Sequence, residues 1–391
     1  MRHRFLVLIT STLLLVLLGC STTKKSVNSG TGFLFLATEG NASVSAYTVS
    51  LSNGSISTNG SSIQTGGAPS AMIFDPAGTA LFVSSPGSNS LCSQPCVSSY
   101  TVSSNGGLTG ASIQSTGVGV GPGGMAIDSG GKFLFVANQG TFADPTSGTV
   151  SVFSLQGTTL SPVVGSPFLT ETPGETIGTG PTAVAAVGNY LYVANNFTNT
   201  ISAFSFDTSG VLTQLPTPNY ATGIAPAALA VSRAGGFLYV ANSGSNNVSA
   251  FAVCASASAT CIAADGTLAQ ISGSPFSAGL DPVSIGVDPA ADFVYVADRQ
   301  SNQLSQYQAS SGTGALSPLS PPTVSTGLNP VSVSVQPFGG YVFVANSGGA
   351  TVSTFSVGST TSGTTTTFTG ILTPVTNSLS TGGQPSALIA R

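Results

Sequence analysis

A short apolar and aromatic segment recurs along the chain from residue 33 onward. It reads FLFLAT at residues 33–38, FLFVAN at 133–138, FLYVAN at 237–242 and YVFVAN at 341–346, with similar copies at 80–85, 190–195 and 293–298. Because almost every position is apolar, each copy is typical of a strand that is buried on both faces. Equivalent valine or leucine positions lie between 47 residues apart (Leu36 to Val83) and 57 residues apart (Val136 to Val193). A repeat of this length, made of short strands and turns, indicates a propeller or a similar array.

Three more strand signals accompany each copy of this segment. A strand that begins at a proline precedes it, as at Pro226 and Pro282. A strand with alternating apolar and polar residues follows it, as in NVSAFAV at 247–253, and a fourth strand follows a glycine turn such as Gly210. Each of the seven units therefore predicts one four-stranded blade.

The two ends of the repeat complement each other. The first unit starts at Phe33 without a proline-initiated strand, whereas the chain ends with such a strand, PSALIA at 385–390. We therefore expect an all-β fold: a seven-bladed β-propeller of four-stranded blades over residues 32–391, whose ring is closed by the C-terminal strand completing the first blade. An open solenoid is the alternative, but it leaves the missing strand and the spare strand unexplained. The threonine-rich segment 360–369 is expected to form a loop with some strand character.

Residues 1–19 have the pattern of a signal peptide. The basic residues Arg2 and Arg4 precede an apolar run over residues 5–18, which is short for a membrane span. The run ends in Leu-Leu-Gly followed by Cys20, which resembles the bacterial lipoprotein signal. A plain secretory signal with an incidental cysteine is the alternative.

The lipoprotein resemblance implies that Cys20 is lipidated and becomes the first mature residue. Acyl chains on this cysteine would hold the protein to a membrane, and residues 20–31 would form a polar tether. Ser21 follows the cysteine, which favours the outer membrane where a cell has one. We therefore expect an extracytoplasmic protein, lipid-anchored to the bacterial cell envelope.

The composition excludes several classes of protein. Only 5% of the residues are charged, and the formal net charge is −4, with eight Lys and Arg residues in all. A nucleic-acid partner is therefore not expected, because such binding depends on clustered basic residues. His3 is the only histidine and lies in the predicted signal peptide, so no histidine-dependent catalytic triad can form in the mature chain.

Four further cysteines form two close pairs, Cys92 with Cys96 and Cys254 with Cys261. In an oxidising compartment such spacing predicts two local disulfides. A zinc site made by both pairs is the alternative, but it requires the pairs to meet in space without a histidine. We expect no metal and no cofactor.

The FLYVAN-type strands, the Ser-Asn turns that follow them and the Val-Ser-Ala-Phe strands resemble the YVTN-repeat and lactonase-like propeller family. The resemblance spans about residues 32–391 and implies the seven-bladed fold. The family includes enzymes similar to 6-phosphogluconolactonase and many proteins of unassigned role, so the fold alone does not imply an activity. Its enzymes are associated with His, Glu and Arg residues near the channel mouth.

Propeller topology predicts which loops share a face. The loops before the first strands and those between the second and third strands lie together, on what we call the top face. Its predicted charged residues are one cation, Arg299, and six carboxylates: Glu39, Asp144, Glu171, Glu175, Asp281 and Asp298. The turns between first and second strands lie on the opposite, bottom face.

Lactone hydrolysis needs a base that activates water and a donor that stabilises the oxyanion. Asp281, Asp298 and Arg299, all in the sixth unit, are therefore the candidate catalytic residues. Drift within the repeat is the alternative for both aspartates, because Asp298 takes the place of an asparagine such as Asn242, and Asp281 that of Ala225.

Three enlarged loops, 84–97, 139–148 and 169–180, belong to the top face near blades two to four. They predict a surface for a protein, cell-wall or glycan partner, with neutral loop drift as the alternative. Because the top face has one cation and no histidine, the sequence favours a non-catalytic binding or scaffold module. The alternative is a lactonase-like hydrolase of a sugar lactone.

Overall fold

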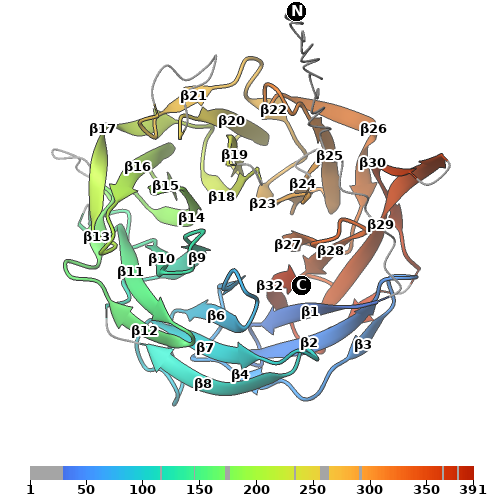
Figure 1. The fold of residues 1–391 in the computed structure, drawn as a ribbon, viewed down its shortest axis with the longest axis horizontal. Helices are drawn as coiled ribbons and strands as arrows, with labels where there is room; N and C mark the ends of the chain where they lie inside the picture. The colour runs from blue at the N-terminus through green and yellow to red at the C-terminus, as the bar shows by residue number, and fades with distance from the viewer. Residues whose placement is uncertain are drawn as a thin grey trace, which may run out of the picture.

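The computed structural model describes residues 30–114, 117–144, 146–171, 177–232, 235–255, 264–289, 293–362, 365–376 and 378–391. Within these residues all regular structure is β-strand, arranged as seven antiparallel sheets around a central axis (Figure 1). The predicted all-β, seven-bladed propeller is therefore confirmed. No helix of the described part is long and apolar enough to cross a membrane.

The blades are numbered in chain order, and each is given from the strand lining the channel outward. Blade 1 contains β32 (Pro385–Ala390), β1 (Thr31–Thr38), β2 (Ser43–Ser50), β3 (Ile56–Thr58) and β4 (Ile63–Gln64). Blade 2 contains β5 (Ala71–Phe74), β6 (Ala80–Ser85), β7 (Cys96–Val102) and β8 (Leu108–Gln114). Blade 3 contains β9 (Pro122–Ile127), β10 (Phe133–Asn138), β11 (Thr149–Gln156), β12 (Thr159–Pro162) and β13 (Phe168–Leu169).

The remaining four blades follow the same plan. Blade 4 contains β14 (Pro181–Val187), β15 (Tyr190–Asn195), β16 (Thr200–Phe206) and β17 (Leu212–Ala221). Blade 5 contains β18 (Pro226–Val231), β19 (Phe237–Asn242), β20 (Asn247–Val253), β21 (Leu268–Gln270) and β22 (Phe276–Ser277). Blade 6 contains β23 (Pro282–Val287), β24 (Phe293–Asp298), β25 (Gln303–Ala309) and β26 (Leu316–Ser325). Blade 7 contains β27 (Pro330–Val335), β28 (Tyr341–Asn346), β29 (Thr351–Ser362), β30 (Thr365–Pro374) and β31 (Leu379–Ser380).

The ring closes through the pairing of β32 with β1. Leu36 lies opposite Leu388, and the backbone groups of Phe33 and Arg391 exchange two hydrogen bonds of 2.9 and 2.8 Å. The C-terminus accordingly lies next to β1 in Figure 1. The predicted closure is confirmed, and residues 30–391 contain every strand of the ring.

The hydrophobic core lies between the blades. Each of seven buried clusters takes side chains from two neighbouring blades, one cluster for each interface. The second strand of a blade pairs with strands on both edges and packs against neighbours on both faces. This is why its sequence is continuously apolar rather than alternating.

An aromatic ring packed on a glycine recurs at these interfaces. The ring of Phe237 in blade 5 lies against Gly314 in the turn between β25 and β26 of blade 6, where an added Cβ would lie 2.4 Å from Cδ1. The same contact joins Phe293 to Gly370, and Tyr341 of blade 7 to Gly54 of blade 1. Each of these glycines has a positive φ, which side chains adopt at a cost.

A buried tyrosine hydroxyl also donates a hydrogen bond to the backbone carbonyl of the same glycine at two of these interfaces. Tyr239 donates to the carbonyl of Gly314 at 3.0 Å, and Tyr295 donates to the carbonyl of Gly370 at 2.8 Å. Both tyrosine side chains are fully buried, so these hydrogen bonds satisfy their only polar atom. The aromatic pattern of the second strand thus fixes the distance and angle between neighbouring blades.

The structure corrects some local expectations and confirms one disulfide. The threonine-rich segment 360–369 is mainly strand, because β29 and β30 extend as one hairpin. In blades 1, 3 and 5 the outermost strand is divided into two short strands, and in blade 7 the short strand β31 follows the ten-residue β30. Cys92 and Cys96 form the predicted disulfide, whereas Cys261 and residues 1–29, with Cys20, lie outside the described residues.

The substitution Gly314→Ala tests the aromatic-on-glycine contact. Its Cβ would meet the Phe237 ring, so we expect the free energy of unfolding to fall by about 3 kcal/mol, combining overpacking with the cost of a left-handed conformation. Gly157→Ala is the matched control, because Gly157 (φ 61°) also lies in a turn before an outer strand but has nothing within 4 Å of its added Cβ. That control should cost about 1 kcal/mol. Urea unfolding measures both, and equal losses would contradict the proposed role of the contact.

Candidate functional site

Two backbone positions of the same blade meet at the top face in six of the seven blades. One directly precedes the inner strand, and the other directly follows the second strand. In blade 6 the Arg299 N–H donates to the Asp281 carbonyl at 2.9 Å, and in blade 7 the Ser347 N–H donates to the Asn329 carbonyl at the same distance. We call these two residues of a blade its mouth pair. The expected placement of both kinds of loop on one face is therefore confirmed.

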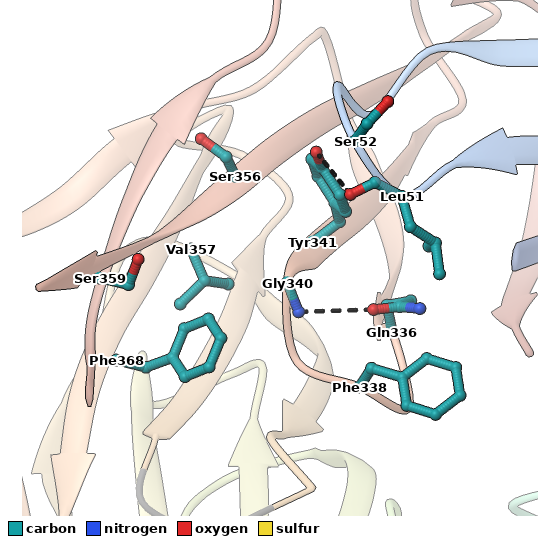
Figure 2. A pocket seen from close by; sticks show the side chains of 10 residues that line it. All are labelled: Leu51, Ser52, Gln336, Phe338, Gly340, Tyr341, Ser356, Val357, Ser359 and Phe368. Carbon is teal, nitrogen blue, oxygen red and sulfur yellow. Dashed lines mark hydrogen bonds between the residues drawn. The ribbon is translucent and has the colours of Figure 1, made fainter. Parts of the chain in front are cut away.

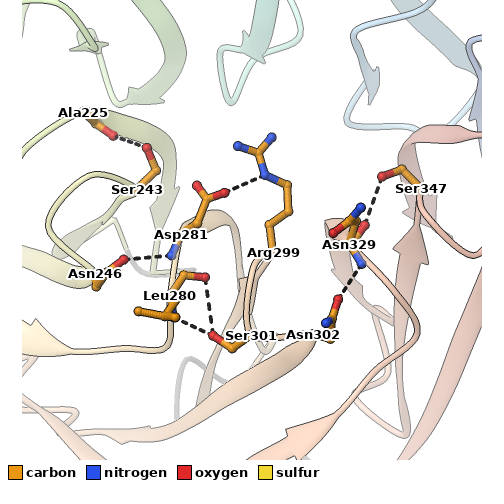
Figure 3. Close-up of polar contacts among 10 residues, drawn as sticks. All are labelled: Ala225, Ser243, Asn246, Leu280, Asp281, Arg299, Ser301, Asn302, Asn329 and Ser347. Atoms are coloured by element: carbon orange, nitrogen blue, oxygen red, sulfur yellow. Dashed lines mark hydrogen bonds and ion pairs between the residues drawn. The ribbon is translucent and has the colours of Figure 1, made fainter.

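The mouth pair of blade 6 departs from its neighbours. In blades 5 and 7 a serine hydroxyl donates to the carbonyl of its partner, from Ser243 to Ala225 at 2.9 Å and from Ser347 to Asn329 at 3.1 Å. In blade 6 Arg299 Nε instead donates to Asp281 Oδ2 at 2.7 Å (Figure 3). The two positions thus carry opposite charges in blade 6, whereas neither is charged in blades 5 and 7.

Asp281 is held in place before it meets the arginine. Its φ is 58°, a left-handed conformation, and its backbone N–H donates to Asn246 Oδ1 at 2.8 Å. Asn199 and Asn302 make the same bond to the residues that precede the inner strands of blades 5 and 7. We call this hydrogen bond from a backbone N–H to an asparagine of the preceding blade the asparagine clip. It recurs in blades 5, 6 and 7, and in blade 6 it holds the Asp281 carboxylate at the channel mouth.

The ion pair leaves part of the arginine available. The Asp281 side chain is 10% exposed, whereas that of Arg299 is 48% exposed. Arg299 uses only Nε in this pair, and Figure 3 shows its two terminal nitrogens directed away from the carboxylate. Among the described residues no acceptor bonds these terminal nitrogens. They form a planar pair of donors suited to a carbonyl, carboxylate or oxyanion.

A polar cavity of about 440 Å³ opens beside this pair, between blades 6, 7 and 1. It is lined by two carboxylates, one guanidinium, three amides and two hydroxyls: Glu39, Asp281, Arg299, Gln300, Asn329, Gln384, Ser347 and Ser386, together with Val331 and Pro385. Val331 and Ser386 also line the central channel, a cavity of about 300 Å³ enclosed by the inner strands. The site is therefore a polar recess at the channel mouth.

Glu39 is a member of this site that the sequence pattern did not single out. It is the second residue of the blade 1 mouth pair, because its backbone N–H donates to the Gln384 carbonyl at 2.9 Å. It is exposed to solvent and carries a carboxylate where blades 5 and 7 carry serine. The signal that could have found it is this departure from the repeat, which it shares with Arg299.

Asp298 lies apart from the other two candidate catalytic residues. Its side chain is fully buried inside blade 6, and Oδ2 accepts a hydrogen bond from Ser305 Oγ at 2.7 Å. The equivalent Asn242 donates to Ser249 Oγ at 2.9 Å. The structure thus brings Asp281 and Arg299 together and leaves Asp298 outside the cavity lining. Burial in the blade raises the pKa of Asp298 to about 6.

The enlarged loops occupy another sector of the top face. The Gly178 N–H donates to the Phe142 carbonyl at 2.9 Å, so the loops of blades 3 and 4 support each other. The rings of Phe142 and Phe197 lie edge to face with centroids 5.6 Å apart. The loop of blade 2 is closed by the Cys92–Cys96 disulfide. These loops surround blades 2 to 4, whereas the polar cavity lies at blades 6, 7 and 1.

A smaller cavity of about 170 Å³ lies on the bottom face between blades 7 and 1 (Figure 2). Its lining is largely apolar, from Leu51, Phe338, Tyr341, Val357 and Phe368, and includes no charged side chain. It therefore offers neither a base nor a strong donor. No cluster of three or more His, Cys, Asp or Glu side chains suited to a metal occurs among the described residues.

Comparison with known proteins identifies the fold with a described family. The profile of the family described as "Lactonase, 7-bladed beta-propeller" matches residues 28–143, 146–265 and 266–379. Among curated proteins, none matches the sequence significantly.

Two solved structures illustrate the similarity in fold. The periplasmic gluconolactonase PpgL of Pseudomonas aeruginosa is 21% identical, with a TM-score of 0.74, over 92% of this chain and 99% of its own. A candidate 6-phosphogluconolactonase of Bacteroides fragilis is 20% identical, with a TM-score of 0.73, over 94% of this chain and 99% of its own. At such identity the likeness concerns the fold alone.

The pKa of Asp298 predicts a pH dependence of stability. Burial raises this pKa from 3.8 to about 6, because the folded blade disfavours the ionised carboxylate. The free energy of unfolding is therefore highest below pH 4, where the carboxyl is protonated, and part of it is lost as the pH rises through 6. Asp298→Asn restores the amide of the other blades, so we expect it to raise the free energy of unfolding at pH 7 by about 2–3 kcal/mol. At pH 4 the two proteins should be nearly equal. Urea unfolding from pH 4 to 8 measures the difference, and a constant difference would contradict the shifted pKa.

Proposed function

Because this chain belongs to the family of seven-bladed lactonase propellers, we propose that it hydrolyses a neutral sugar lactone in the polar cavity between blades 6, 7 and 1. The observation that carries the proposal is the shared placement of Glu39, Asp281 and Arg299 around that cavity. Family membership supports hydrolysis more than the non-catalytic role that the sequence pattern favours.

The proposed reaction assigns one role to each charged side chain. A water molecule attacks the lactone carbonyl carbon while the Glu39 carboxylate accepts its proton. The terminal nitrogens of Arg299 donate hydrogen bonds to the oxyanion that forms. The ring carbon–oxygen bond then breaks, the leaving oxygen takes the proton from Glu39, and an open-chain hydroxy acid is released. Asp281 is a positioning residue, because its carboxylate is occupied by Arg299 Nε.

The charge balance of the cavity favours a substrate without phosphate. Arg299 is its only cation among the described residues, and Asp281 already neutralises it. Glu39 leaves the lining with a net negative charge. A phosphate group is usually held by several cationic or N–H donors and would meet repulsion here. The amides of Gln300, Asn329 and Gln384 suit the hydroxyl groups of an uncharged sugar.

The proposed compartment is extracytoplasmic. The Cys92–Cys96 disulfide supports it, because such bonds persist in oxidising compartments. The fold relative from Pseudomonas aeruginosa is described as periplasmic, which agrees with this placement. Lipidation of Cys20 and attachment to the outer membrane remain part of the same proposal.

A non-catalytic binding module is the second candidate function. The observation in its favour is that the three enlarged loops lie away from the polar cavity, around blades 2 to 4. Such a module would bind a ligand at those loops and leave lactones unchanged.

Kinetics of residues 30–391 with glucono-1,5-lactone test the proposal, with proton release followed above the spontaneous rate. We expect Glu39→Gln and Arg299→Gln each to lower kcat/KM by about 100-fold, since each removes a group that acts in the transition state. Asp144→Asn, another carboxylate of the top face, and Lys132→Gln on the bottom face are the matched controls and should leave the rate unchanged. A wild-type rate equal to the spontaneous rate would contradict hydrolysis and favour the binding module.

A further inference from the structure

Exposed apolar side chains collect on the top face. Nine large apolar residues are exposed in the described part of the chain, and six of them lie on loops of this face. We call these six the apolar rim: Leu91, Val120, Phe142, Ile224, Leu280 and Leu328. Of the other three, Phe338 lies on the bottom face and Val164 on the outer edge of blade 3, whereas Leu169 ends the outer strand β13 beside the top face.

Four members of the apolar rim occupy the same position of the repeat. Val120, Ile224, Leu280 and Leu328 each stand two residues before the proline of an inner strand and are 53–59% exposed. Their carbonyls accept backbone hydrogen bonds from the neighbouring turn, as from Gln300 N–H to Leu280 at 3.2 Å and from Gly348 N–H to Leu328 at 3.0 Å. The backbone therefore holds these side chains in fixed places, while more than half of each faces solvent.

The two remaining members extend the apolar rim across blades 2 to 4. Phe142 is 55% exposed, and its ring packs edge to face against the ring of Phe197. Leu91 lies in the loop that the Cys92–Cys96 disulfide closes. Packing within the propeller does not account for six exposed apolar residues on one face, and such a concentration is typical of an interaction surface.

The charges of the top face restrict what can cover the apolar rim. Glu39, Asp144 and Glu171 are carboxylates of this face, and Arg299 is its only cation among the described residues. Arg299 is already paired with Asp281. A second copy of the chain would bring carboxylates against carboxylates, and an anionic membrane surface would be repelled in the same way.

We propose that the top face docks a partner polypeptide whose contact segment carries both apolar and basic side chains. The apolar side chains of the partner cover the apolar rim, and its lysines or arginines lie opposite Asp144, an exposed carboxylate of the same face. This inference does not depend on lactone hydrolysis, because it involves no chemical step and assigns no role to Glu39 or Arg299.

The test measures binding of a fluorescent peptide of alternating lysine and leucine to residues 30–391 by anisotropy. Peptides in which serine replaces leucine, or glutamate replaces lysine, are the comparison probes. The rim variant Ile224→Ser/Leu280→Ser/Leu328→Ser removes three rim residues without changing a charge. The control Val164→Ser/Phe338→Ser removes the two exposed apolar residues that lie away from this face.

We expect the lysine–leucine peptide to bind, both comparison probes to bind at least about tenfold more weakly, and the rim variant to lose about tenfold in affinity. The control variant should bind like the wild type, with circular dichroism confirming that both variants are folded. The proposal is overturned if the wild type does not bind the peptide or if both variants bind equally. It is also overturned if rim-dependent self-association in ultracentrifugation, or rim-dependent binding to phosphatidylglycerol vesicles, replaces peptide binding.

Discussion

The contact between an aromatic ring of one blade and a glycine of the next determines the geometry on which the rest of the molecule depends. The contacts of Phe237 with Gly314, Phe293 with Gly370 and Tyr341 with Gly54 repeat this arrangement around the ring, including the interface between the last blade and the first. Buried tyrosine hydroxyls bond the carbonyls of two of these glycines. A side chain at the glycine would push neighbouring blades apart, and the polar cavity depends on the spacing of blades 6, 7 and 1.

The candidate site consists of departures from an otherwise regular frame. In blades 5, 6 and 7 the repeat supplies the asparagine clip that holds the residue before the inner strand, and it supplies the carbonyl bonded by the turn after the second strand. Blade 6 places Asp281 and Arg299 on this frame, and blade 1 places Glu39 on the equivalent position. A few substitutions can therefore build a charged, polar recess without disturbing the blades that carry it.

Much of the fold could be predicted from the sequence, because the repeat encodes it in period and strand pattern. The number of blades, the closure by residues 385–390 and the face that bears Asp281 and Arg299 all follow from strand order. The pairing of Asp281 with Arg299 could not be predicted in this way, since it depends on a left-handed backbone and on Asn246 from the preceding blade. Glu39 was correctly expected on the top face but was not grouped with the site, because its backbone partner Gln384 lies at the other end of the chain.

The proposed hydrolysis of neutral lactones depends on the charge balance at the channel mouth. The most direct measurement compares kcat/KM for glucono-1,5-lactone with that for its 6-phosphate, both corrected for spontaneous opening. We expect kcat/KM to be at least about tenfold higher for the neutral lactone. Arg299 is already neutralised and lies beside Glu39, so the cavity offers a phosphate no net attraction. A preference for the phosphorylated lactone, or no acceleration with either compound, would contradict the proposal.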